Sequence, residues 1–280
     1  MNNEVESYNF HKKRFKIIAS NLFKTSQINY CIKLSRGESS KKDLVIAVCR
    51  ENESNNIIIY KVFTKTILYP FEVKSKIYVM VRLKYENNFY LVTPELPNIV
   101  FWDYNKGTKY KTLSHAHKNY IFQIISFEDV MKYMLVTCSY DKSIKIWDTK
   151  PEICNKIDTN NPVWLITRIK NYNRNYFISC ENNNYIRIWN VLTQECIMST
   201  NIIKAQSISY LIQPGFMTCE ELFFLSGSLK LIQIKDNKLI GSELIEDMRI
   251  SAYCFIYFKG RVLFICSIYN KELKFYELMY

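Results

Sequence analysis

The chain has 280 residues, 48% hydrophobic and 15% aromatic, which allows one large domain or two small ones with a substantial core and excludes a largely disordered chain. Its 38 Lys and Arg against 26 Asp and Glu give a formal net charge of +12. This charge points to an acidic partner, such as nucleic acid, anionic lipid or an acidic protein, although lysines spread along the whole chain favour a solvated basic surface set by composition.

The first eleven residues, MNNEVESYNFH, are polar, and we expect residues 1–11 to be an extension outside a single folded domain of residues 12–280. This stretch lacks the features of a signal peptide, so we expect an intracellular protein, in the cytoplasm or alternatively in the nucleus. The next segment, KKRFKIIAS at residues 12–20, is strand-like and precedes an inner strand expected near residues 27–33.

The rest of the chain contains an internal repeat, a short apolar strand with a bulky residue near its end. These residues are 42, 45, 42, 43 and 44 positions apart, and they are Tyr60, Trp102, Trp147, Trp189, Ile232 and Tyr276. Short β-rich runs without helical periodicity predict four strands per unit, which in the third unit are YIFQIISF, KYMLVTCS, SIKIWD and EICNKID. A four-stranded sheet cannot bury both faces alone, so we expect the all-β units to stack around a common axis.

The third unit resembles the repeats of the WD-repeat β-propeller family. Trp147 and the following Asp match the signature pair, and His117 matches the histidine of the family's Gly-His dipeptide, with Ala in place of the Gly. Thr137 matches the hydroxyl of the second strand, and Asp141 the turn aspartate. The resemblance implies that His117, Thr137, Asp141 and Trp147 form a structural hydrogen-bonded network, since buried indole and imidazole groups need partners.

Two neighbouring units carry part of this motif. The second has the signature pair at Trp102 and Asp103. In the fourth, Trp189 is followed by Asn, Ser179 stands at the hydroxyl position, and Asn183 stands at the turn-aspartate position. The first, fifth and sixth units keep only the strand pattern, so their boundaries are less well defined.

The last strand of the sixth unit, near residues 272–278, ends the chain, which leaves that unit without an outer strand. We predict that residues 12–20 supply it, which gives a propeller of six blades closed by an N-terminal strand. The alternative is seven blades, with the seventh donated by a partner or hidden in residues 1–55. The apolar stretch of residues 250–269 is interrupted by Lys259, Gly260 and Arg261, so it predicts a hairpin, and we expect no membrane insertion.

The sequence offers little raw material for catalysis or metal binding. It contains none of the common nucleotide-binding, zinc-protease or nucleophile-elbow motifs, and its nine cysteines include no C-x-x-C pair. His115 and His117 lack a third metal ligand, and Ser139 beside Asp141 is interpreted as part of a turn rather than of a hydrolytic triad. We therefore predict no enzyme activity, no catalytic residues, no metal and no cofactor.

What remains is a recognition surface. Partners of the family dock mainly near the start of the first strand and before the turn aspartate of each blade, and the resemblance carries these positions to Asn119, Tyr120, Tyr140, Asn182 and Glu95. Trp164, a tryptophan outside the signature, begins the first strand of the fourth unit. It suits either an interface hot spot or packing between blades.

The function implied by the resemblance is that of a non-enzymatic scaffold for protein–protein interactions within a larger intracellular complex. One alternative is a basic RNA- or ribosome-associated propeller, which the dispersed charge makes less favoured. A second is an open propeller of the vesicle-coat or nuclear-pore type, completed by a partner's blade. The sequence does not determine the partner or the oligomeric state.

Overall fold

The structure is a computed structural model of the chain. It describes residues 5–9, 14–19, 27–36, 44–51, 56–61, 66–73, 75, 77–85, 88–127, 134–148, 153–169, 175–182, 185–201, 210–212, 221–225, 229–235, 238–245, 250–258, 261–268 and 273–278. All the regular secondary structure described there is β-strand, as predicted. In this part of the chain no helix is long and apolar enough to span a bilayer.

Two strands precede the repeats: β1 (Val5–Asn9) and β2 (Arg14–Ala19) pair antiparallel in a two-stranded sheet. Within residues 1–11, Val5–Asn9 thus form a strand, and the assignment of this segment as an extension outside the folded domain stays a prediction. The segment 14–19 is a strand that pairs with β1, and the prediction that it completes the last sheet stays a prediction. Pairing across a short connection costs less chain entropy than pairing with the distant end of the chain.

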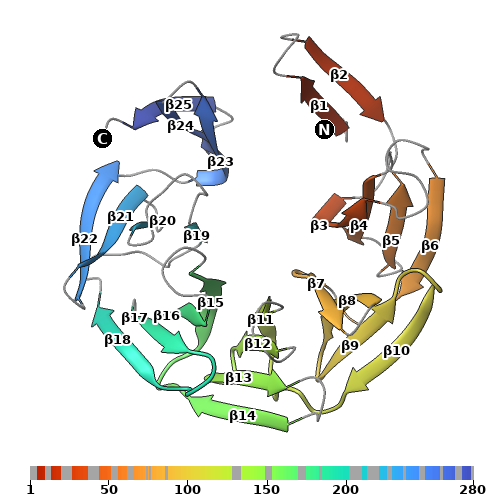
Figure 1. Cartoon of the computed structure of the whole chain (residues 1–280), viewed down its shortest axis with the longest axis horizontal. Coiled ribbons are helices and arrows are strands. Elements are labelled where there is room, and N and C mark those ends of the chain that lie inside the picture. Colours follow the sequence, from red (N-terminus) through yellow and green to blue (C-terminus); the bar gives the residue numbers. More distant parts are fainter. Residues whose placement is uncertain are drawn as a thin grey trace. The chain divides into compact units, whose positions relative to one another are not determined.

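Three four-stranded sheets follow, in chain order (Figure 1). The first contains β3 (Gln27–Arg36), β4 (Leu44–Glu51), β5 (Asn56–Lys61) and β6 (Thr66–Glu72). The second contains β7 (Val81–Tyr85), β8 (Asn88–Glu95), β9 (Asn98–Asp103) and β10 (Thr108–Leu113). The third contains β11 (Ile121–Phe127), β12 (Met134–Ser139), β13 (Ser143–Asp148) and β14 (Ile153–Asp158).

The remaining strands form two more sheets of four strands and one of three. The fourth contains β15 (Val163–Arg168), β16 (Tyr176–Glu181), β17 (Tyr185–Asn190) and β18 (Cys196–Asn201). The fifth contains β19 (Tyr210–Ile212), β20 (Glu221–Leu225), β21 (Leu229–Lys235) and β22 (Lys238–Ile245). The last contains β23 (Ile250–Phe258), β24 (Arg261–Ile268) and β25 (Leu273–Leu278), and β23 and β24 form the predicted hairpin.

These sheets correspond to the six repeats found in the sequence. Each repeated bulky residue lies on the third strand of its sheet, namely β5, β9, β13, β17, β21 and β25. Within each sheet the strands follow one another in chain order, as a four-stranded meander requires. The number of blades, six or seven, stays a prediction.

The chain divides into two compact units, residues 1–134 with 148–152, and residues 135–147 with 153–280. In the first unit a buried cluster joins the first two sheets: the rings of Phe71 on β6 and Trp102 on β9 lie 4.8 Å apart between centroids. The Arg82 guanidinium on β7 donates a hydrogen bond of 2.6 Å to the carbonyl oxygen of Leu34 on β3. This packing between sheets explains why their inner strands are apolar on both faces.

In the fourth sheet, which belongs to the second unit, no residue of the inner strands is exposed. All residues of β16 except the first are buried, and β17 buries Ile186, Ile188 and Trp189. The outer strand β18 leaves most of its residues exposed or half-buried. Burial therefore falls from the inner strands toward the outer edge of the sheet.

Candidate interaction surfaces

Three tryptophans make the same buried hydrogen bond, each on the third strand of its sheet. The indole Nε1 of Trp147 donates to Thr137 Oγ1 at 3.0 Å, and that of Trp189 donates to Ser179 Oγ at 2.7 Å. The indole of Trp102 donates to Thr93 Oγ1 at 2.9 Å. The bond joins the second and third strands of each sheet and satisfies a buried N–H group.

Sequence reasoning missed Thr93, although a signal was present. The hydroxyl residue lies nine positions before Trp102, and ten before Trp147 and Trp189. A spacing of ten points to Val92, and the hydroxyl one residue later was the available signal. It was missed because the turn between the second and third strands of this unit is one residue shorter.

The turn before β13 is built by short side chains. The backbone N–H of Asp141 donates to Ser139 Oγ at 3.0 Å, and Ser143 Oγ donates to Asp141 Oδ1 at 2.6 Å. Lys142 adopts a left-handed backbone with φ of 61°. This compact turn presents the side chain of Tyr140 at the surface, where 47% of it is exposed.

Tyr140 contacts the other exposed aromatic residue predicted for this region, Trp164. Their ring centroids lie 6.3 Å apart at 88°, an edge-to-face arrangement, and Trp164 is 38% exposed. The neighbouring loops are tied together: Thr159 N donates to the carbonyl of Lys142 at 2.9 Å, and Asn182 N donates to that of Pro162 at 2.9 Å. We call Tyr140 and Trp164 the aromatic pair.

The other predicted site residues differ from one another in how exposed they are. Tyr120 is 61% exposed, and its backbone N–H donates to Asn119 Oδ1 at 2.8 Å. Asn182 is exposed. Glu95 is only 3% exposed, which argues against the predicted direct contact with a partner. It is buried because β8 is an inner strand whose last six residues are all buried.

His117 is 2% exposed, and its backbone N–H donates to the carbonyl oxygen of Pro97 at 3.3 Å. Its predicted part in a hydrogen-bonded network with Thr137, Asp141 and Trp147 stays a prediction. His115 is exposed, so the two imidazoles occupy different environments. Among the described residues, no group of three or more His, Cys, Asp or Glu side chains could hold a metal ion.

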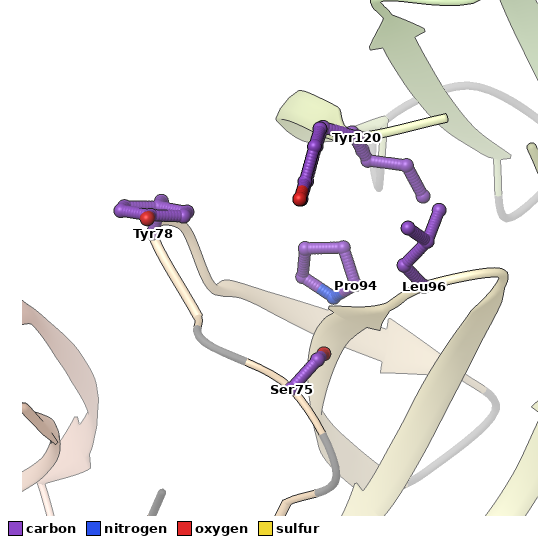
Figure 2. Close-up of a pocket in the computed structure, with 6 residues that line it drawn as sticks. Ser75, Tyr78, Pro94, Leu96 and Tyr120 are labelled. Atoms are coloured by element: carbon purple, nitrogen blue, oxygen red, sulfur yellow. The ribbon is translucent and has the colours of Figure 1, made fainter. Parts of the chain in front are cut away.

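A second exposed group of apolar side chains lies in the first unit. A pocket of about 390 Å³ is lined by Ser75, Tyr78, Pro94, Leu96, Tyr120 and Ile121 (Figure 2). Tyr78 is 56% exposed and Leu96 is 38% exposed. Sequence reasoning found Tyr120 but not Tyr78, because Tyr78 lies in a connection outside the repeated motif.

Comparison with known proteins agrees with this architecture. A family model described as WD domain, G-beta repeat matches residues 107–148. This segment includes the turn at Gly107 and ends with strand β13. No curated protein matches the sequence significantly.

Solved structures are similar over almost the whole chain. A chain in a structure titled "Crystal Structure of Mitotic Checkpoint Complex" aligns with a TM-score of 0.74 and 14% identity, covering 100% of this chain and 82% of that one. A chain in "Crystal structure of BBS1N in complex with ARL6DN, soaked with lead" aligns with a TM-score of 0.66 and 13% identity, covering 90% of this chain and 79% of that one. Residues 107–148 are thus a WD repeat, and the chain has the fold of a WD-repeat β-propeller.

Proposed function

We propose that the protein is a non-enzymatic scaffold that binds other proteins within a larger assembly. The observation that carries this proposal is the aromatic pair: Tyr140 and Trp164 touch each other and still expose 47% and 38% of their surfaces. Trp and Tyr are the residue types that most often dominate protein interfaces, because they bury much apolar area at little cost in conformational entropy.

The surroundings of the pair support this role. Backbone hydrogen bonds hold the adjoining loops through Thr159 and Asn182, so the two rings start from a preorganised position. Preorganisation reduces the entropy cost of binding. The two solved structures described above are titled as complexes, which supports partner proteins in general.

The test is affinity capture of the full chain from its native cells, with quantitative mass spectrometry of the proteins that co-purify. Tyr140→Ala and Trp164→Ala are compared with the parent, and Leu192→Ala is the matched control, because Leu192 is 44% exposed but lies outside the pair. We expect both aromatic variants to lose the same partners by about tenfold or more, while the control retains them.

Thermal melting of each variant checks that it is folded. Retention of every partner by both aromatic variants would overturn the assignment of the pair. Capture that disappears after nuclease treatment would favour the RNA-associated alternative instead, since that binding would pass through nucleic acid.

A further inference from the structure

The pocket of the first unit is formed by three separate segments of the chain. They are the connection before β7, which carries Ser75 and Tyr78, the turn between β8 and β9, which carries Leu96, and the approach to β11, which carries Tyr120. Figure 2 shows the Tyr78 ring set apart from the Tyr120 ring, with Pro94 below Tyr120 and Leu96 to the right of Pro94. The converging segments create a concave site with an apolar wall.

The exposure of this wall is costly without an occupant. Tyr78, Leu96 and Tyr120 are 56%, 38% and 61% exposed, although other large apolar side chains of the same segments, such as Ile77 and Met80, are buried to 1% exposure. Exposed apolar residues that gather around one hollow mark a binding surface more often than isolated ones do. The size of the hollow suits a single bulky aliphatic or aromatic side chain with some of its flanking backbone.

A polar atom in the lining lacks a partner. Ser75 Oγ is buried, and among the described residues it makes no hydrogen bond. A buried hydroxyl without a partner is destabilising, and a ligand can offset this by supplying an N–H or a C=O group. The backbone of an extended peptide supplies both groups beside its side chain.

The charge around the pocket is positive. In the described parts of residues 75–80, 94–98 and 114–121, Lys118 is exposed, whereas the only carboxylate, Glu95, is 3% exposed. Over residues 77–127, with 86 and 87 left out, the one further carboxylate is Asp103, which is 7% exposed. In the same range, the side chains of Lys84, Lys106 and Lys109 are exposed. An acidic partner therefore meets no exposed negative charge in these described ranges, although the exposed Glu72 precedes Ser75 by three residues.

We infer that this pocket binds an extended acidic segment of a partner protein, which inserts one leucine-like side chain between Tyr78 and Tyr120 and places its carboxylates toward Lys118. The Ser75 hydroxyl bonds the backbone of the bound segment. The inference rests on the proposed scaffold function and adds the chemistry of one partner. The apolar wall and the unpaired hydroxyl favour a peptide over nucleic acid, which would need stacking platforms along a basic groove.

The test measures the fluorescence polarisation of a short labelled peptide as the full chain is added. The peptide has two leucines between runs of glutamate. Comparison peptides replace the leucines with serine or the glutamates with lysine, and a labelled oligouridine is the nucleic-acid probe. We expect the acidic leucine peptide to bind about tenfold more tightly than either comparison peptide, and its affinity to fall as salt is added.

The variants Tyr120→Ala and Tyr78→Ala should each weaken this peptide by about tenfold, and Lys118→Glu by about fivefold. Ile67→Ala is the matched control for the aromatic variants, because Ile67 is exposed in the first unit and does not line the pocket; it should bind like the parent. Lys84→Glu makes the same change in net charge outside the lining and should weaken the peptide less than Lys118→Glu does. Melting curves establish that all variants are folded. Ser75→Ala removes only the hydroxyl that is proposed to bond the peptide backbone. It is therefore a second test that does not depend on the aromatic variants.

Equal affinity for the leucine and serine peptides, or unchanged binding in the pocket variants, would overturn the inference. Tighter binding of oligouridine than of the peptide would overturn it in favour of nucleic acid. Loss of partners in the aromatic-pair variants together with no peptide binding would contradict the inference about the pocket but not the proposed scaffold function. Peptide binding together with full partner retention in those variants would sink only the role given to the aromatic pair.

Discussion

The indole Nε1 of Trp189 lies 2.7 Å from the hydroxyl oxygen of Ser179 and donates a buried hydrogen bond to it. The sequence places these residues ten positions apart, on the two inner strands of one sheet, and Phe177 stacks on the same indole at 6.5 Å between ring centroids. The corresponding bonds of the second and third sheets make this the common structural element of three consecutive repeats.

Trp147 gives the first prediction, because its contribution to stability can be divided between volume and hydrogen bonding. Trp147→Ala should destabilise the protein by roughly 3–5 kcal/mol through a cavity, since only 6% of the side chain is exposed. Trp147→Phe keeps most of the volume but removes the donor to Thr137, and should cost about 1–2 kcal/mol. Urea unfolding measures both, and a Trp147→Phe protein as stable as the parent would show that the hydrogen bond carries no separate contribution.

Asp141 gives the second prediction. Asp141→Ala removes the acceptor of the Ser143 hydroxyl, which is fully buried, and should cost about 1–3 kcal/mol. Asp141→Asn keeps an acceptor oxygen and serves as the control. An Asp141→Ala protein that melts at the temperature of the parent would show that the turn does not depend on this carboxylate.

The buried ion pair between Arg187 and Glu181 gives the third prediction. The Glu181 side chain is 0% exposed and that of Arg187 is 18% exposed. Arg187→Met should cost about 3–5 kcal/mol, because it leaves a buried charge without its partner. The double variant with Glu181→Leu should regain most of this loss in urea unfolding, and additive losses would contradict the pairing.

The turn at Gln194 gives the fourth prediction. Gln194 has a φ of 65°, and its N–H donates to the carbonyl of Asn190 at 2.8 Å. Gly107 occupies the matching turn of the second sheet with a φ of 72° and the same bond to Asp103. Because glycine adopts this left-handed region without strain, Gln194→Gly should stabilise by about 1 kcal/mol.

The reciprocal change, Gly107→Ala, should destabilise by about the same amount. Differential scanning calorimetry of both variants measures the two effects. A lower melting temperature for Gln194→Gly would show that the Gln194 side chain contributes more than the backbone strain costs.

Cys180 gives the fifth prediction, which concerns pH. Burial raises the pKa of the Cys180 thiol from its ordinary value of 9.0 to about 12. As the pH rises, the unfolded chain therefore loses the thiol proton before the folded chain does. The contribution of this thiol to the free energy of unfolding is complete below pH 9.0 and is lost as the pH rises toward 12. Between about pH 8 and about pH 10 the parent should lose about 1 kcal/mol more than Cys180→Ala does.

Urea unfolding of both proteins at the two pH values measures this difference. Other groups that titrate in the range, such as Lys and Tyr, contribute equally to both proteins and cancel in the comparison. An identical pH dependence would show that the thiol is accessible to solvent in the native state.

The sequence by itself determined the strands of the repeats, their number per repeat and the repeated bulky position, but not strand β1. It could do so because a strand that is buried on both faces must be apolar along its length, and turns require Asn, Asp or Gly. The hydroxyl partners Thr137 and Ser179 followed from the same repeat, whereas Thr93 lies one residue away from the position that their spacing gives. The exposure of Tyr120 and Tyr140 also agrees with their positions in the motif.

Only the tertiary structure decided which of the remaining polar and aromatic residues reach the surface. Glu95 is buried because its strand lies inside the second sheet, and β2 pairs with β1 because a local hairpin costs little entropy. The edge contact of Tyr140 with Trp164, and the pocket that unites Ser75, Tyr78 and Tyr120, depend on segments far apart in the sequence. A repeat pattern fixes which face of a strand is apolar, whereas the packing of neighbouring segments determines whether that face is covered.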